Sequence, residues 1–202
     1  LNSMRLMAGM QGKSGIANML EKLGKLLRAN LAVEGMEIPL STELELLDSY
    51  VYIQNIRLNG KIRYTREGVP AALMSQQIAK FTLQPIVENA ILHGMNGKDG
   101  KCDLQISGWE QGRFVYLSVR DTGKGMQAEQ VNQLLQCLYS KQNTSGKEEG
   151  GNGIALSNVL QRLQLYFGSS CGLNIESEWG KGTVVTLWIP RKGDLDVPGA
   201  NS

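Results

Sequence analysis

The sequence predicts an α/β fold preceded by a helical hairpin, and two patterns of apolar residues carry this prediction. Between residues 16 and 58, apolar side chains recur every three or four positions, as on one face of an α-helix. After Gly60, short segments alternate between apolar and polar residues, as in strands, and helical segments lie between them. We therefore expect a helical part at residues 1–60, an α/β domain at residues 61–190 and a disordered tail at residues 191–202.

The helical part is interpreted as two helices joined by a short connection. The first spans 16–31 on its apolar stripe. The second begins near Thr42, because Thr42 and Glu45 have the spacing of a capping box, and Asn59-Gly60 ends it. The apolar seam between the helices is equally suited to a partner chain.

The α/β domain is expected to alternate short strands with helices. The long polar stretch at residues 139–152 is typical of a mobile functional loop. We expect strands near 62–64, 102–106, 115–119, 173–175 and 184–189, helices near 71–80, 84–94, 131–138 and 154–167, and a hairpin turn at 110–112.

Composition excludes several classes of function. The 202 residues include 21 Lys and Arg against 19 Asp and Glu, so no basic field exists to hold a nucleic acid. Cys102, Cys137 and Cys171 lack Cys-x-x-Cys spacing, which fits a reduced cytoplasmic setting without zinc. No apolar run is long enough to span a membrane, and the start at Leu1, inside a helical pattern, suggests a fragment of a longer protein.

The first chemical motif is Glu88-Asn89 on the helix expected at residues 84–94. The carboxylate and the amide belong to adjacent residues next to the apolar face of the helix. Such a pair can coordinate a hydrated Mg²⁺, which binds a few protein oxygens together with phosphate oxygens. A solvated helix flank is an equally good interpretation of this motif alone.

The second motif, Asp121-Thr122-Gly123-Lys124-Gly125, directly follows an expected buried strand. Its glycines let the backbone approach a flat ligand, and its carboxylate can accept a hydrogen bond from an exocyclic amine such as that of adenine. A plain turn after the strand is the alternative.

The third motif is a glycine loop at residues 150–153 that leads into a helix. Free N–H groups at a helix N-terminus favour phosphate. The loop is neither a P-loop, since no Gly-Lys-Ser/Thr follows, nor a dinucleotide fingerprint, since no strand immediately precedes it. An ordinary helix entry is the alternative.

Together with Gly180-Lys181-Gly182-Thr183, the order and spacing of these motifs resemble the GHKL (Bergerat) ATP-binding fold of histidine kinases. The resemblance covers nearly the whole chain, and residues 40–57 and 83–89 are similar to LytS/YesM-like sensor kinases in particular. It implies a two-layer α/β sandwich, a mixed sheet with helices on one face. The N box would span residues 83–94, the G1 box 121–125 and the G2 box 151–158.

The resemblance also implies roles for individual residues. ATP would lie between the N-box helix and the lid, with its adenine amine at Asp121 and Mg²⁺ held by Asn89 and Glu88, which would also serve catalysis. The single histidine, His93, would pack beside the nucleotide or bind phosphate rather than accept the phosphoryl group. The full nucleotide-binding set implied is Asn89, His93, Asp121, Gly123, Gly125, Gly151, Gly153, Ile154, Leu156 and Thr183.

In such kinases the phosphoacceptor histidine lies shortly before a segment ending in Leu-Asn-Ser, and this chain opens with Leu1-Asn2-Ser3. We therefore expect a protein histidine kinase fragment that binds Mg-ATP but does not autophosphorylate, and that works with a response regulator. The resemblance also implies a homodimer formed through the N-terminal helices. The fragment would be the cytoplasmic portion of a sensor kinase anchored upstream in the inner or plasma membrane.

Three departures from the family pattern bear on activity. Leu92 stands where many histidine kinases have a phosphate-binding lysine, so loop residues such as Lys141 or Lys147 would have to bind the phosphate instead. Ala155 replaces the usual glycine of the G2 box. Pro85 stands where hydrolytic relatives carry a glutamate base, so rapid ATP hydrolysis is not expected. The alternatives are a GHKL ATPase of the gyrase, MutL or Hsp90 type, and a regulatory or docking module without kinase activity. A further alternative is an ATP-binding regulator such as an anti-sigma kinase, which targets serine.

Overall fold

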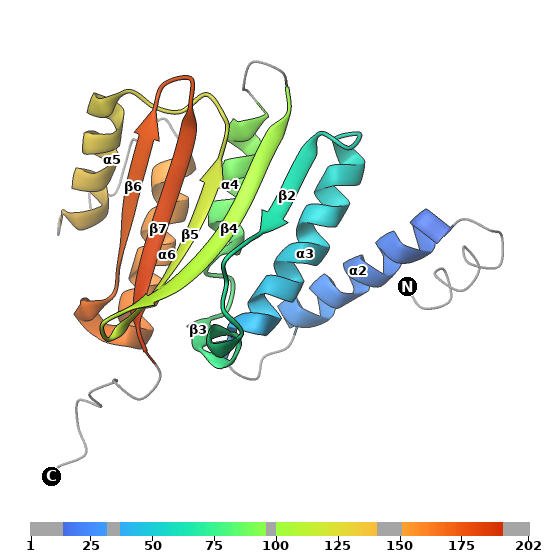
Figure 1. Ribbon diagram of the computed structural model, residues 1–202, viewed down its shortest axis with the longest axis horizontal. Helices are drawn as coiled ribbons and strands as arrows, with labels where there is room; N and C mark the ends of the chain where they lie inside the picture. Colours follow the sequence, from blue (N-terminus) through green and yellow to red (C-terminus); the bar gives the residue numbers. More distant parts are fainter. Residues whose placement is uncertain (1–13, 32–36, 96–99, 141–150, 192–202) are drawn as a thin grey trace, which may run out of the picture.

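The centre of the protein is a mixed five-stranded sheet (Figure 1). The structure, a computed structural model, describes residues 14–31, 37–95, 100–140 and 151–191. Strands β2 and β4 are parallel, and the other neighbouring strands are antiparallel. In spatial order the strands are β2 (Ile62–Arg66), β4 (Cys102–Gln111), β5 (Phe114–Asp121), β7 (Gly182–Pro190) and β6 (Gly172–Glu178).

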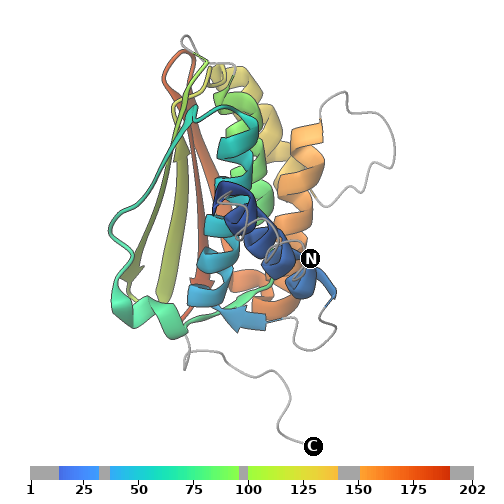
Figure 2. The same cartoon turned by 90° about the vertical axis from the view of Figure 1, so that its right-hand side faces the viewer.

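Helices cover one face of this sheet, as Figure 2 shows. Alternate residues of β5, Val115, Leu117 and Val119, are buried, because a strand directs every second side chain to the same face. The two-layer α/β sandwich and the mixed sheet expected from the sequence are thus confirmed. The helices of this layer are α3 (Leu40–Arg57), α4 (Gln84–Gly94), α5 (Ala128–Tyr139) and α6 (Gly151–Phe167).

The opposite face of the sheet carries polar and aromatic side chains. The rings of Trp109 and Tyr116 stack there with centroids 5.3 Å apart, and Trp188 lies 6.4 Å from Tyr116. Ser107 and Ser118 form a cross-strand hydrogen bond of 2.9 Å on the same face. The buried core therefore lies between the sheet and the helices.

The two N-terminal helices play different parts in this architecture. Helix α2 (Ser14–Leu31) packs against α3 on the outer side, with Leu23 and Leu27 37% and 44% exposed. Helix α3 instead contributes Leu40, Leu44 and other apolar side chains to the same core as the strands. Among the described helices, none is both long and apolar enough to span a membrane.

Two sequence-based expectations about local structure are wrong. Residues 71–80 do not form an α-helix: a 3₁₀ helix, Ala71–Ser75, is followed by β3 (Gln77–Ala79), which pairs antiparallel with β1 (Glu37–Pro39). The capping box is absent, because α3 begins two residues before Thr42 with Pro39 as its N-cap and no side-chain cap.

Other boundaries differ by a few residues. Helix α6 begins at Gly151 rather than Ile154, so the expected loop is shorter, and its residues 141–150 lie outside the described residues. The tail at 192–202 also lies outside them. The helix expected at 84–94, with its proline in the first turn, is found with the same bounds.

Candidate functional site

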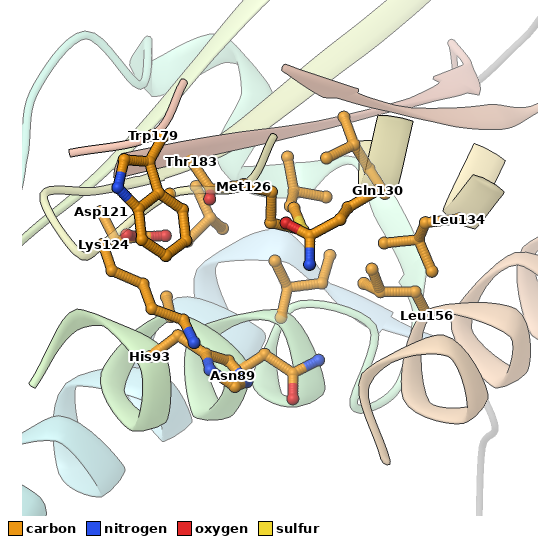
Figure 3. A pocket seen from close by; sticks show the side chains of 16 residues that line it. Asn89, His93, Asp121, Lys124, Met126, Gln130, Leu134, Leu156, Trp179 and Thr183 are labelled. Atoms are coloured by element: carbon orange, nitrogen blue, oxygen red, sulfur yellow. The ribbon is translucent and has the colours of Figure 1, made fainter. Parts of the chain in front are cut away.

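A cavity of about 190 Å³ lies between α4 and the strands β5, β6 and β7 (Figure 3). Helices α5 and α6 close one end, and the segment after β5 closes the other. Its lining combines an apolar floor with a few polar groups, as is usual for small-molecule sites. The lining residues are Ile86, Asn89, Ala90, His93, Val119, Asp121, Lys124, Gly125, Met126, Gln130, Leu134, Leu156, Ile175, Trp179, Thr183 and Val185.

Helix α4 brings two polar side chains to the cavity. Asn89 and His93 are four residues apart, so both lie on the same face of the helix. Pro85 lies in the first turn, where a missing N–H costs nothing, and buried Ile86 and Ala90 anchor the helix on the core. Among the described residues, the buried Nδ2 of Asn89 has no hydrogen-bond partner, so this amide has bonding capacity left for a ligand.

Asp121 ends strand β5 at the bottom of the cavity and is only 7% exposed. Burial raises the pKa of its carboxyl group, while backbone N–H groups of Gly123 and Thr183 and the charge of His93 oppose the rise. Its Oδ1 accepts a 2.8 Å hydrogen bond from the Gly123 N–H, which fixes the carboxyl group in place. A buried, oriented carboxylate of this kind is suited to recognise a single donor group on a ligand.

Glycine is required where the loop after Asp121 passes its neighbours. A Cβ on Gly123 would lie 2.8 Å from the Cα of Gly94, and a Cβ on Gly125 would overlap the carbonyl group of Glu178. Gly125 also has a φ of +66°, a conformation that other residues rarely adopt. These glycines therefore allow the loop to pack between the end of α4 and the β6–β7 hairpin.

Hydrogen bonds fasten this loop to the β6–β7 hairpin. The Gly180 N–H donates to the carbonyl of Lys124 at 2.6 Å, and the Met126 N–H donates to Ser177 Oγ at 2.9 Å. Ser177 Oγ also lies 2.9 Å from Thr183 Oγ1 at the edge of the cavity. Asp121, Lys124 and Thr183 therefore belong to one connected wall, although about 60 residues separate their segments.

The structure brings many of the expected site residues together. Asn89, His93, Asp121, Gly125, Leu156 and Thr183 all line the cavity. Gly123 lies in the loop after Asp121 and packs against Gly94 at the end of α4. Gly151 is the first residue of α6.

Besides Gly123, three expected residues do not line the cavity. Glu88 is exposed, and its Oε1 accepts a 2.9 Å hydrogen bond from the Gln84 amide. Ile154 is 60% exposed, and neither it nor Gly153 lines the cavity.

Several residues of the lining are not predicted from the sequence motifs, among them a lysine, a tryptophan and a methionine. Lys124 lies between the two glycines of the Asp121 motif, and Trp179 directly precedes Gly180. For both residues, the position beside the glycines of a motif is the signal that the sequence offers. Gln130 and Leu134 lie on α5 and Met126 precedes it, and their side chains reach the cavity only through the packing of these elements.

Two family models match the chain. The model described as histidine kinase-, DNA gyrase B-, and HSP90-like ATPase matches residues 74–193. The model described as histidine kinase matches residues 1–62. Together they cover the helical part and the α/β part that the sequence patterns distinguish.

Similar curated proteins are sensor kinases. Sensor histidine kinase YesM of Bacillus subtilis (strain 168) is 28% identical over 96% of this chain and 31% of its own length. Sensor protein LytS of the same strain is 32% identical over 91% of this chain and 30% of its own length. The chain thus spans about a third of the length of these relatives.

Solved structures agree on the fold. The catalytic domain of histidine kinase ThkA superposes with a TM-score of 0.53 at 15% identity, covering 77% of this chain and 94% of that chain. The histidine kinase domain of the EL346 blue-light activated kinase from Erythrobacter litoralis gives 0.51 at 18% identity, covering 93% of this chain and 84% of that chain. With the family model matched over residues 74–193, the chain belongs to the histidine kinase-, DNA gyrase B-, and HSP90-like ATPase family.

Proposed function

We propose that the cavity binds Mg-ATP and that the chain is the catalytic part of a sensor histidine kinase. It transfers the γ-phosphoryl group of ATP to a histidine on a segment outside this sequence, for relay to a response regulator. The observation that carries this proposal is the convergence of Asn89, Asp121 and Thr183, from three distant segments, on a single cavity.

Asp121 is proposed to recognise the adenine base. Its carboxylate accepts a hydrogen bond from the exocyclic amine, while apolar residues such as Val119 and Ile175 contact the ring. Because the carboxyl group is buried and already oriented by Gly123, little conformational freedom is lost when the base binds.

The residues of the cavity fit a magnesium ion that is shared with phosphate groups. Among the described residues, no cluster of three His, Cys, Asp or Glu could hold a metal alone, so phosphate oxygens and water would supply most of the ligands. Turning the Asn89 amide by 180° places its oxygen where the partnerless Nδ2 lies. Glu88 is bonded to Gln84 outside the cavity, so we propose Asn89 as the principal ligand. The bound ion would neutralise negative charge on the phosphates.

Phosphoryl transfer by these residues rests on positioning rather than on a protein base. Helix α6 begins at Gly151, so its free N–H groups offer a site for phosphate. His93 lies on the same helix face as Asn89, within the cavity, where it can contact bound nucleotide but not present an imidazole from another domain. Pro85 provides no group to activate water, which disfavours the ATPase alternative.

The relatives and helix α2 support the proposed partners. The relatives are named as a sensor histidine kinase and a sensor protein, so we propose a response regulator as the partner of this chain and a membrane-anchored sensor kinase as the whole protein. Leu23, Leu27 and Leu31 leave an apolar stripe on α2 that is 37%, 44% and 77% exposed. We propose that this stripe pairs with a second copy of the chain.

Calorimetry with a non-hydrolysable ATP analogue and Mg²⁺ tests the nucleotide site. The unaltered chain is expected to bind one analogue per protomer, and steady-state ATP hydrolysis is expected to stay near background. Rapid hydrolysis would favour the ATPase alternative, and no binding would favour a docking module. Stable transfer of ³²P to the isolated chain would overturn the proposal that the acceptor lies outside it.

A further inference from the structure

Trp179 differs from the other two tryptophans of the chain in its surroundings. Trp109 and Trp188 lie with Tyr116 on the outer face of the sheet, and Trp188 Nε1 donates a 3.1 Å hydrogen bond to Ser170. Trp179 lines the cavity instead and is 55% exposed. Within the described parts of the chain, its ring stacks on no aromatic side chain and its N–H has no hydrogen-bond partner. A large ring left open beside a cavity is available for a ligand.

Backbone contacts fix the turn that carries Trp179 at one end of the cavity. Trp179 lies between the last residue of β6, Glu178, and Gly180, whose N–H donates to Lys124 at 2.6 Å. Gly182 packs against the backbone of Asp121 so closely that a Cβ there would overlap its carbonyl oxygen. The turn that carries the indole is therefore fixed to the loop that carries the cavity's carboxylate.

The indole lies at the Asp121 end of the cavity. Figure 3 shows Trp179 beside Asp121, Lys124 and Thr183, with Leu134 and Leu156 at the opposite end. A base whose amine reaches Asp121 brings its ring system to this same end. A planar ring there lies within reach of the indole, and aromatic rings stack on nucleic-acid bases.

We propose that Trp179 is a nucleotide-contacting residue that stacks on the purine base held by Asp121. This inference rests on the proposed ATP function, and it adds a base-contacting residue that lies outside the motifs identified in the sequence. Stacking depends on the ring and not on its hydrogen-bonding edge, so Trp179 contributes to affinity, while Asp121 selects the base. The backbone contacts of the turn reduce the entropy lost on binding, because the backbone that carries the ring is already ordered.

The test compares Trp179→Ala and Trp179→Phe with Trp109→Phe, a tryptophan change on the opposite face of the sheet. Affinities are measured for adenosine, for a non-hydrolysable ATP analogue with Mg²⁺, and for tripolyphosphate, which has no base. Trp179→Ala should weaken adenosine and the analogue by a similar factor, about tenfold to a hundredfold, and leave tripolyphosphate unchanged. Trp179→Phe should retain most of the affinity, and Trp109→Phe all of it.

Tryptophan fluorescence gives a second readout. The analogue should change the emission of the unaltered chain and of Trp109→Phe, but not that of Trp179→Phe. Unchanged affinities in Trp179→Ala, together with tight binding that Asp121→Asn weakens, would overturn the stacking contact and leave the ATP site standing. No affinity of the unaltered chain for either adenosine or the analogue would overturn the proposed function and the stacking contact with it.

Discussion

The buried carboxylate of Glu43 in α3 accepts a 3.0 Å hydrogen bond from the backbone N–H of Leu83, the residue directly before α4. Its other oxygen accepts a 3.0 Å bond from the N–H of Phe81, which has a φ of +59°. From the other side, Arg162 of α6 donates to the carbonyl of Phe81 at 3.0 Å. The segment that starts the Asn89 helix is therefore fixed by α3 and α6 together.

Replacing Glu43 by Gln should lower the free energy of unfolding by about 1–3 kcal/mol. Only one atom of the glutamine amide accepts hydrogen bonds, so one of the two backbone N–H groups would face a donor. Urea unfolding measures the change. Glu45→Gln on the same helix is the control, because its ion pair with Lys25 is largely exposed and should contribute less than about 1 kcal/mol. Equal losses in both variants would contradict the role assigned to Glu43.

The affinity for adenosine should fall as the pH is lowered, because protonated Asp121 accepts a hydrogen bond from the amine less well. Burial raises the pKa of Asp121, so the decrease should begin at a higher pH than the ordinary aspartate value predicts. Adenosine is the ligand of choice, since it has no phosphate that titrates nearby. The measurement is calorimetry across a series of pH values.

Asp121→Asn is the matched control for this pH dependence. The neutral amide keeps an acceptor oxygen but loses the charge, so binding should weaken by about tenfold at neutral pH and lose the decrease at low pH. An unchanged pH profile in Asp121→Asn would show that another group causes the dependence.

Asn89→Ala should reduce the gain in ATP-analogue affinity that Mg²⁺ provides, because it removes the proposed amide ligand. The experiment measures affinity with Mg²⁺ and with a chelator in each variant. Glu88→Gln is the comparison and should keep most of the gain, since Glu88 is exposed and bonded to Gln84. A larger loss in Glu88→Gln than in Asn89→Ala would reverse the proposed assignment of the metal ligand.

Lys124→Ala should weaken binding of the ATP analogue by about twofold to fivefold while leaving adenosine binding nearly unchanged. Lys124 lines the cavity, and its side chain extends across it towards α4 in Figure 3. Lys181→Ala is the control, because Lys181 is exposed and paired with Glu178 at 2.7 Å. The effect of Lys124→Ala should shrink as salt is added; equal effects on adenosine would point to a packing role.

The sequence predicted those parts of the fold that short-range patterns determine. Helix α4 is found at the expected bounds because Pro85 suits its first turn and its apolar residues are periodic. The segment at 71–80 was mistaken for a helix because its strand, β3, forms only by pairing with residues 37–39, far away in the sequence. The β propensity of a segment does not reveal whether a distant segment will pair with it.

The site was predicted to a similar extent and for similar reasons. Asn89, Asp121 and Thr183 can be predicted from the sequence, because each belongs to a recognisable motif. Asn89 lies on the face of an expected helix, and Asp121 and Thr183 lie at the ends of expected strands. Lys124 and Trp179 were not selected, since their place in the cavity depends on the backbone bonds between the Asp121 loop and the β6–β7 hairpin. Glu88 was included because it is adjacent to Asn89, although neighbouring helix residues point in different directions.

Backbone amide NMR shifts, mapped during titration with a Mg²⁺-bound ATP analogue, show whether the three segments form one binding site. The amides of Asn89, Gly125 and Thr183 should shift together with one common affinity. Shifts confined to one of these segments, or different affinities for different segments, would contradict a single magnesium-nucleotide pocket.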